Sequence, residues 1–381
     1  MPGPPDLRGK GAIVTGGGSG ICLAFTKELY QRGCNVLICD LGLHREAQTW
    51  LETLTTNNDN NDKNNGDEPP PPPPQVVFNK TDVSDWKQLE AAFDVYEKEF
   101  GGVPYVLCPG AGVYEPSAPN FWNDKDDDGY KLLKINLEHP IKMSRIAIRK
   151  WVQQQGQAGP PTPRGHGHGH GHGHGHGHGH GHGHEQGKRK RPPIVGNIVL
   201  VSSTGAQKSS ILTPLYGAAK QGISNFARAM AGLREMEGIR VTAVAPGPTM
   251  SPLMYDHPEA IRFVDPEKDK LCSTDEIARG MMAVCFEEGD ADEDADADAD
   301  QGGDAGAGAG AGAGEQANGG EEERKKFFPP GTVLEVTHPN RWREVKLLDD
   351  PGPGPHAWTS RKEEAIVDVV KALEEDRKGG K

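Results

Sequence analysis

The segment SSTGAQKSSILTPLYGAAK contains three side chains whose types and spacing suit proton transfer: Ser203, Tyr216 and Lys220. Tyr216 and Lys220 are four residues apart at the start of an expected helix, so their side chains share one face. A tyrosine has an unperturbed pKa of about 10, and it acts as a base near neutral pH only when cations stabilise its phenolate. Lys220 supplies one such cation. The same spacing also arises by chance on many amphipathic helices.

Ser203 ends the apolar run GNIVLVSS, residues 196–203, which we expect to be a strand. Open α/β sheets bind ligands at the carboxyl ends of their strands. Ser203 is therefore expected to meet Tyr216 at that edge of a sheet. Positioning these groups requires that the rest of the chain build such a sheet.

Short apolar runs alternate with longer amphipathic segments along the chain, which is typical of β-α-β units around a parallel sheet. We expect seven strands, at 11–15, 35–40, 75–83, 104–110, 196–203, 239–247 and 331–336. We expect helices at 20–32, 43–55, 85–100, 128–155, 214–236 and 274–286, the third capped by Ser84. The predicted fold class is α/β, a doubly wound parallel sheet of about seven strands.

The first expected strand runs into TGGGSGIC, residues 15–22, and then into a helix. Backbone N–H groups and the positive helix N-terminus at such a turn favour bound phosphate. A glycine-rich turn alone is weak evidence, since glycine also serves plain turn geometry. Asp40 ends the second strand, where a carboxylate would accept hydrogen bonds from ribose hydroxyls and repel a 2′-phosphate. These residues predict an NAD site, and a plain turn cap is the alternative for Asp40.

Three low-complexity stretches interrupt the chain: the Asn/Asp and polyproline run 57–74, the Gly-His repeat with its flanks 156–193, and the acidic Gly-Ala run 287–326. Each falls in a connection between elements, where added length costs loop-closure entropy only logarithmically. We therefore predict a single domain over 8–340 with loop inserts, followed by a C-terminal extension over 341–381.

The extension contains SRKEEAIVDVVKALEE, which has the start of a capping box in Ser360 and Glu363. Its apolar residues share one helix face at 365, 366, 369, 370 and 373. We expect this helix to pack on the body of the domain or on a partner subunit. It would carry Trp358 toward a site.

The formal net charge of −13 is concentrated in the acidic insert, and nothing in it favours nucleic acid as a partner. The six cysteines show no paired ligand spacing, which favours free thiols in a reducing compartment. The N-terminus has no apolar core, and no run of 18 apolar residues occurs. We predict a soluble cytoplasmic protein that does not bind membranes.

Ten alternating histidines at 166–184 could chelate Zn, Ni or Cu. Because a low-complexity tract lacks fixed geometry, we favour a simple expansion and predict no metal site. KRKR at 188–191 is either a nuclear signal or a solvated loop flank, and we favour the flank.

The ordered set TGGGSGI, TDV, CPGAG, KIN, VSS, YGAAK and APG resembles the short-chain dehydrogenase/reductase family in its single-domain, Rossmann-like branch. The resemblance covers roughly 8–56, 75–155, 194–286 and 327–336. It implies that Tyr216 is the acid/base, that Ser203 hydrogen-bonds the reacting oxygen and that Asn136 orders a proton-relay water. It also implies that Lys220 holds the nicotinamide ribose and lowers the pKa of the tyrosine. The implied cofactor-binding residues are Gly16, Ser19, Gly20, Ile21, Asp40, Asp82, Val83, Gly110, Ala111, Tyr216, Lys220, Pro246, Gly247, Thr249 and Ser251.

Two positions depart from the family pattern. PGAG at 109–112 stands where the family commonly has Asn-Asn-Ala-Gly, so the amides that brace the central strand are missing. Cys22 stands where the third glycine lets the helix approach the strand, and its side chain should cost packing energy of about 1–3 kcal/mol if unrelieved.

The resemblance implies hydride transfer between a secondary alcohol, or its ketone, and a nicotinamide, with Tyr216 as acid/base. Asp40 favours NAD and the oxidative direction, while Arg45 is the nearby residue that could favour a 2′-phosphate. The pattern looks most like NAD-dependent members of the 15-hydroxyprostaglandin dehydrogenase type, assembled as homodimers or homotetramers. Candidate substrate-lining residues are Leu253, Met254, Tyr255 and Phe263. The alternatives are a non-catalytic scaffold with this fold and an NADP-dependent ketoreductase.

Overall fold

A single eight-stranded sheet organises the protein. The computed structural model describes residues 6–58, 73–115, 121–123, 129–157, 191–208, 210–261, 264–265, 267–286, 328–346 and 366–379. The strands are β1 Gly11–Thr15, β2 Asn35–Asp40, β3 Val76–Lys80, β4 Val106–Pro109, β5 Gly196–Val201, β6 Ile239–Pro246, β7 Val333–Thr337 and β8 Arg341–Glu344. Their order is β3-β2-β1-β4-β5-β6-β7-β8, and all pairs are parallel except β7 with β8. This confirms the doubly wound, Rossmann-like class.

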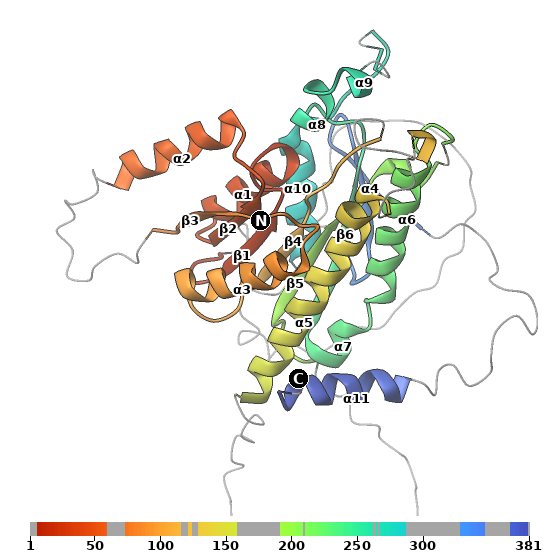
Figure 1. The fold of residues 1–381 in the computed structure, drawn as a ribbon. Coiled ribbons are helices and arrows are strands. Elements are labelled where there is room, and N and C mark those ends of the chain that lie inside the picture. Colours follow the sequence, from red (N-terminus) through yellow and green to blue (C-terminus); the bar gives the residue numbers. More distant parts are fainter. Residues whose placement is uncertain are drawn as a thin grey trace, which may run out of the picture.

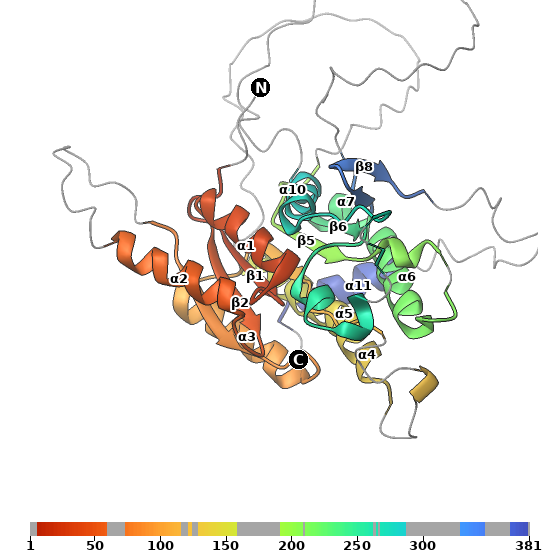
Figure 2. The ribbon, with the colours of Figure 1, turned by 90° about the horizontal axis from the view of Figure 1, so that it is seen from above.

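Helices cover both faces of this sheet (Figure 1). The α-helices of the described residues are α1 Gly20–Gln31, α2 Arg45–Asn58, α3 Trp86–Phe100, α4 Lys131–Leu133, α5 His139–Gln157, α6 Pro214–Ala229, α7 Leu233–Glu237, α8 Pro252–Tyr255, α9 Pro258–Ile261, α10 Thr274–Cys285 and α11 Ile366–Arg377. Viewed from above, α1 to α3 lie beside one half of the sheet and α5 and α6 beside the other (Figure 2).

Alternation along the strands divides the core into two layers. In β1, Ile13 belongs to the core cluster that includes residues of α3, α5 and α6, whereas its neighbours Ala12 and Val14 belong to the cluster that includes residues of α1 and α10. Because successive strand residues point to opposite faces, a strand covered on both sides is apolar throughout. All five residues of β1 are buried, as this rule requires.

The strand order reverses between β1 and β4, which pair in the middle of the sheet. The connections that follow these two strands leave toward opposite faces, and this opens a crevice at their carboxyl ends. The loops after β1 and β4, together with those after β5 and β6, form the walls of the site described below.

The helix expected over 128–155 is interrupted by a π-helical turn, Lys134–Glu138, between α4 and α5. The helix expected over 214–236 is split into α6 and α7, and Gly232 precedes the second part. Asp85, not Ser84, caps α3, because its carboxylate accepts the Lys87 N–H. Strand boundaries differ from expectation by a few residues at most.

The chain beyond residue 340 contributes to the sheet through β8, which pairs with β7 and adds a strand to the seven expected. Helix α11 packs against α5 at the end of the molecule opposite α8 and α9 (Figure 1). Leu373 is buried there, whereas Val369 and Val370 remain exposed. The predicted capping box and Trp358 lie outside the described residues.

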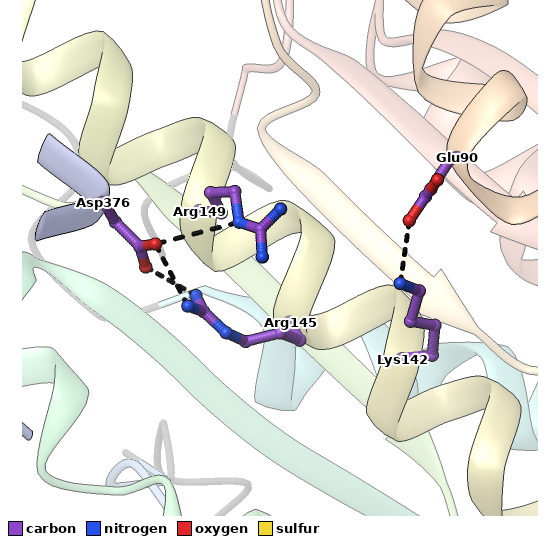
Figure 3. Close-up of polar contacts among 5 residues, drawn as sticks. All are labelled: Glu90, Lys142, Arg145, Arg149 and Asp376. Carbon is purple, nitrogen blue, oxygen red and sulfur yellow. Dashed lines mark hydrogen bonds and ion pairs between the residues drawn. The ribbon is translucent and has the colours of Figure 1, made fainter. Parts of the chain in front are cut away.

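Charged pairs anchor α11 and α3 to the outer face of α5 (Figure 3). The Asp376 carboxylate forms ion pairs with the guanidinium groups of Arg145 at 2.6 Å and Arg149 at 3.7 Å. The Lys142 ammonium pairs with the Glu90 carboxylate of α3 at 2.8 Å. Asp376 is almost fully buried, so its pairing with arginine avoids an uncompensated charge. These contacts place the C-terminal helix on the body of the domain.

The three low-complexity stretches fall largely outside the described residues, as does the whole histidine tract 166–184. Within the described part of the chain, the helices are too short or too polar to traverse a lipid bilayer.

Candidate active site

A cavity of about 510 Å³ opens at the carboxyl ends of β1, β4, β5 and β6. Fifteen predicted cofactor residues line it together with Ser203, and they come from segments throughout the chain. They are Gly16, Ser19, Gly20, Ile21, Asp40, Asp82, Val83, Gly110, Ala111, Tyr216, Lys220, Pro246, Gly247, Thr249 and Ser251. Among the predicted catalytic and cofactor-binding residues, all of which the structure describes, Asn136 alone is outside this lining.

The glycine loop has room and donors for an anion. Ser19 precedes α1 without a side-chain capping hydrogen bond, and the first turn carries no acidic residue. The first N–H groups of the helix are therefore left for another acceptor. Gly16 has φ of 73° and Gly20 has φ of 55°, a region that side chains disfavour. A Cβ on Gly18 would overlap the Gly42 carbonyl, so glycine at 18 lets the loop approach the segment after β2.

Asp40 connects this loop to the end of β2. Its carboxylate accepts the Gly18 N–H at 2.9 Å and the Leu41 N–H at 2.7 Å. Burial raises the pKa of Asp40, and these N–H donors act in the opposite direction. Asp40 thus braces the turn and also lines the cavity, and its hydrogen bonds to ribose hydroxyls stay a prediction.

Arg45 lies outside the cavity. It lines a separate shallow groove with Lys27, His44 and Trp50. Asp82 lies at the cavity wall, where its carboxylate accepts the Ser84 hydroxyl at 2.7 Å and the Ser84 N–H at 2.9 Å. These Ser84 hydrogen bonds lower the pKa of Asp82, so it presents a carboxylate there.

Ser203, Tyr216 and Lys220 meet at the cavity as their spacing predicted. Ser203 follows β5 in extended conformation, and its hydroxyl accepts the Gly205 N–H at 3.0 Å. Tyr216 lies in the first turn of α6, and the Lys220 ammonium one turn later lies 5.7 Å from the tyrosine ring centroid. Lys220 also donates to the Val201 carbonyl at 2.9 Å. The sheet end and the helix therefore hold the three groups together.

Burial dominates the proton affinities here. It raises the pKa of Tyr216 to about 12, although the hydrogen bond from Ser203 acts to lower it. Burial lowers the pKa of Lys220 to about 8. Without a bound cofactor the tyrosine is therefore a neutral phenol, and the lowering of its pKa that the resemblance implied stays a prediction.

Asn136 is fully buried in the π-helical turn and is not among the residues that line the cavity. Its carboxamide donates to the Val113 carbonyl at 2.7 Å and accepts the Val113 N–H at 2.9 Å. This two-way bond fixes the loop after β4. The structure thus gives Asn136 a bracing contact with Val113, and the water-ordering role stays a prediction.

A buried histidine supplies part of the support for the central strand that the missing asparagine amides at 109–110 would give. The Ile135 carbonyl, 2.9 Å from His139 Nδ1, can only accept, so Nδ1 carries the proton. His139 Nε2 then accepts the Thr15 hydroxyl at 2.9 Å, and Thr15 Oγ1 accepts the Ala111 N–H at 3.1 Å. This relay connects β1, the loop after β4 and the π-helical turn. Sequence reasoning missed it, because nothing local pairs residue 15 with residue 139.

Glu115 was also missed. It follows the loop after β4, is fully buried, and accepts the backbone N–H of Tyr216 at 2.8 Å. Its neighbour Tyr114 lines the cavity and packs edge-on against Tyr216, with ring centroids 4.9 Å apart. The available signal was a carboxylate just beyond the carboxyl end of an expected strand.

The far wall comes from the segment after β6. Thr249 is buried, and its hydroxyl donates to the Gly247 carbonyl at 2.8 Å. Ser251 precedes α8 as its N-cap residue. Of the four proposed substrate-lining residues, Leu253 and Met254 line the cavity. Tyr255 lies in the shallow groove with Arg45, and Phe263 is outside the described residues.

Comparison with known proteins agrees with this geometry. A family model described as short chain dehydrogenase matches residues 10–159 and 192–261. Cis-4-hydroxycyclohexanecarboxylate dehydrogenase of Sinomonas cyclohexanicum is 26% identical over 286 residues, covering 74% of this chain and 89% of that protein. D-beta-hydroxybutyrate dehydrogenase of Cupriavidus necator is 22% identical over 259 residues, covering 67% and 76%.

Among solved structures, the crystal structure of gox2181 aligns with a TM-score of 0.51 at 20% identity, covering 73% of this chain and 89% of that chain. This likeness supports the fold. The family model covers more than half of the chain, and the predicted family and enzyme class are both confirmed. The chain belongs to the short chain dehydrogenase family and is an NAD(P)-dependent oxidoreductase acting on CH–OH groups.

Proposed function

We propose that this protein is an NAD-dependent dehydrogenase that oxidises a secondary alcohol, or in reverse reduces the corresponding ketone. The observation that carries the proposal is the meeting of Ser203, Tyr216 and Lys220 at one end of the cavity whose other end is the glycine loop. A bound nicotinamide would supply the hydride acceptor beside these three groups.

The residues of the chain handle the alcohol proton. Tyr216 as phenolate would take that proton from the alcohol oxygen, and as phenol it would return a proton to a ketone. Ser203 would donate a hydrogen bond to the same oxygen, where negative charge develops. The free phenol has a pKa of about 12, so a second positive charge beside Lys220 is needed to favour the phenolate. An oxidised cofactor carries that charge, which couples proton removal to cofactor binding.

The choice of NAD over NADP is supported by charge at the ribose end of the cavity. Asp40 lies in the lining and would repel a 2′-phosphate. Arg45, the nearby residue that could attract one, faces the separate groove. Both placements favour the dinucleotide without the extra phosphate.

The lining of the cavity includes side chains with large apolar surfaces. Val113 and Tyr114 line it from the loop after β4, and Leu253 and Met254 line it from α8. We propose an alcohol with an apolar body, in keeping with the resemblance to 15-hydroxyprostaglandin dehydrogenase-type members. Burial of such a body would contribute about 25 cal/mol per Å² of apolar surface.

A spectrophotometric screen tests the proposal. Secondary alcohols and ketones of increasing apolar size are offered with NAD(H) and with NADP(H), and the absorbance of the reduced nicotinamide is followed. We expect turnover that is faster with NAD(H) and improves with apolar size. A preference for NADPH and ketones would instead identify a ketoreductase, and cofactor binding without turnover would identify a scaffold.

We further propose a cytoplasmic location and a homodimeric or homotetrameric assembly. All six cysteines are buried and none of them forms a disulfide, which suits a reducing compartment. Light scattering on the purified protein gives its mass in solution. A mass of one chain would contradict the proposed assembly.

A further inference from the structure

A fully buried carboxylate stands behind the catalytic tyrosine. Glu115 has no exposed surface, and its Oε2 accepts the Tyr216 N–H at 2.8 Å. No ion pair to Glu115 occurs within the described part of the chain. A buried carboxylate without a cation is costly unless hydrogen bonds replace its hydration, so this contact is expected to be strong.

The contact supplies a cap that α6 otherwise lacks. Thr213 precedes the helix without a side-chain capping hydrogen bond, and Pro214 occupies the first turn without an N–H. The N–H of Tyr216 is one of the donors that an α-helix leaves unpaired in its first turn. Glu115 satisfies this donor from a segment 101 residues away, and its charge suits the positive end of the helix.

The same segment also contacts the tyrosine ring. Tyr114 packs edge-on against Tyr216, and Asn136 holds Val113 from the π-helical turn. The loop 113–115 therefore contacts both the backbone N–H and the aromatic ring of Tyr216. Ser203, which follows β5, hydrogen-bonds the Tyr216 hydroxyl. Rotation of the first turn of α6 would move the hydroxyl away from Ser203.

We propose that Glu115 is a positioning residue, which holds the first turn of α6 through the Tyr216 N–H and so sets the place of the acid/base hydroxyl. This inference rests on the proposed function for its kinetic consequence, but the contact itself can be measured without turnover. Misplacement of a reacting group by about 1 Å can lower the rate on the order of 10²-fold.

Two conservative variants separate the effect of side-chain length at residue 115 from the effect of its charge. Glu115→Gln keeps a carbonyl oxygen at the same distance but removes the charge, whereas Glu115→Asp keeps the charge and shortens the side chain. Positioning predicts that kcat in Glu115→Gln stays within about threefold of wild type. It predicts a kcat loss of about tenfold or more in Glu115→Asp and on the order of 10²-fold in Glu115→Ala. NADH dissociation constants should stay within about twofold, since the cofactor loop is untouched.

Glu237→Ala is the matched control, because Glu237 is also buried but pairs with Arg377 at the other end of the molecule. It should lower the melting temperature and leave kcat unchanged. Hydrogen exchange of a peptide spanning 213–219 gives a readout free of turnover, and it should quicken in Glu115→Ala and Glu115→Asp but not in Glu115→Gln or Glu237→Ala.

A higher kcat in Glu115→Asp than in Glu115→Gln would overturn the inference. The charge of residue 115, and not the length of its side chain, would then determine the rate. Unchanged exchange at 213–219 in both Glu115→Asp and Glu115→Ala would overturn it as well. If wild type turns over none of the alcohols and ketones, the proposed function fails, and the exchange experiment still decides whether Glu115 holds α6.

Discussion

The Cys22 thiol lies in the space in front of Gly110, where a Cβ on that glycine would overlap the sulfur. Cys22 stands at the third-glycine position of the cofactor loop, and Gly110 stands where the family commonly has an asparagine. The two departures from the family pattern therefore compensate for each other. The helix keeps its approach to β4 because the missing side chain at 110 makes room for the one added at 22.

This relationship predicts a coupled pair of substitutions. Gly110→Ala should destabilise the protein by about 1–3 kcal/mol, because the new methyl group overlaps the thiol. Cys22→Gly alone should also lower stability, by about 0.5–1 kcal/mol for a glycine in the first helical turn, with no gain in NAD affinity. In the double variant, the loss should be clearly smaller than the sum of the two. Urea unfolding of all four proteins measures the coupling, and additive losses would contradict it.

Tyr216→Phe should abolish turnover while NADH binding stays within about twofold, because only the ionisable hydroxyl is removed. Tyr96→Phe is the control, since Tyr96 is a buried tyrosine of α3 away from the cavity. Steady-state rates and NADH fluorescence titration give both quantities. A Tyr216→Phe protein with a tenth of the wild-type rate would remove Tyr216 from the acid/base role.

Lys220→Met should slow turnover and weaken NAD binding together, and it should change the pH dependence of stability. Burial holds the pKa of Lys220 at about 8, against about 10.4 in an unfolded chain. Between these values the unfolded chain binds a proton that the folded protein has released, so stability rises with pH, by up to ~3 kcal/mol. The difference in unfolding free energy between wild type and Lys220→Met isolates this rise, since the other groups titrate in both. If the difference in unfolding free energy between the two proteins stays constant from pH 8 to 10.5, the lowered pKa of the buried Lys220 is contradicted.

His139 should make the protein sensitive to acid. Burial lowers its pKa to about 4, against about 6.5 when unfolded, so the folded protein resists the proton. As pH falls from 6.5 to 4, the unfolded chain takes up a proton first and stability is lost, by up to ~3 kcal/mol. Compared with wild type, His139→Gln should be less stable at pH 7 but should lose less stability over this range. Equal slopes in urea unfolding would show that the imidazole is not held neutral.

Asp40→Ala should reduce the preference for NAD over NADP about tenfold or more, because the repulsion of a 2′-phosphate disappears. Both cofactors should also bind more weakly, since the Gly18 and Leu41 N–H groups lose their acceptor. Asp40→Asn keeps an acceptor for the loop and separates the two effects. The ratio of kcat/KM for the two cofactors is the measurement, and an unchanged ratio would point to Arg45.

Local patterns in the sequence were enough to predict the sheet, its alternation with helices and the meeting of Ser203, Tyr216 and Lys220 at one edge of it. Apolar periodicity, a glycine turn after a strand, and a tyrosine and lysine four residues apart each depend on neighbours in the chain. Ser203, Tyr216 and Lys220 meet at the cavity for this reason, with positions fixed by one strand end and one helix face. Where a boundary moved, as at the π-helical turn 134–138, packing overrode the periodic pattern.

Only the tertiary structure decided the contacts between distant segments. Cys22 against Gly110, Glu115 on the Tyr216 N–H, and His139 on Thr15 each join positions that no short window contains. The sequence predicted Cys22 and PGAG as two separate defects because it shows residue types but not which of them share a volume. That sharing depends on how closely α1 approaches β4, a distance set by the packing of the whole core.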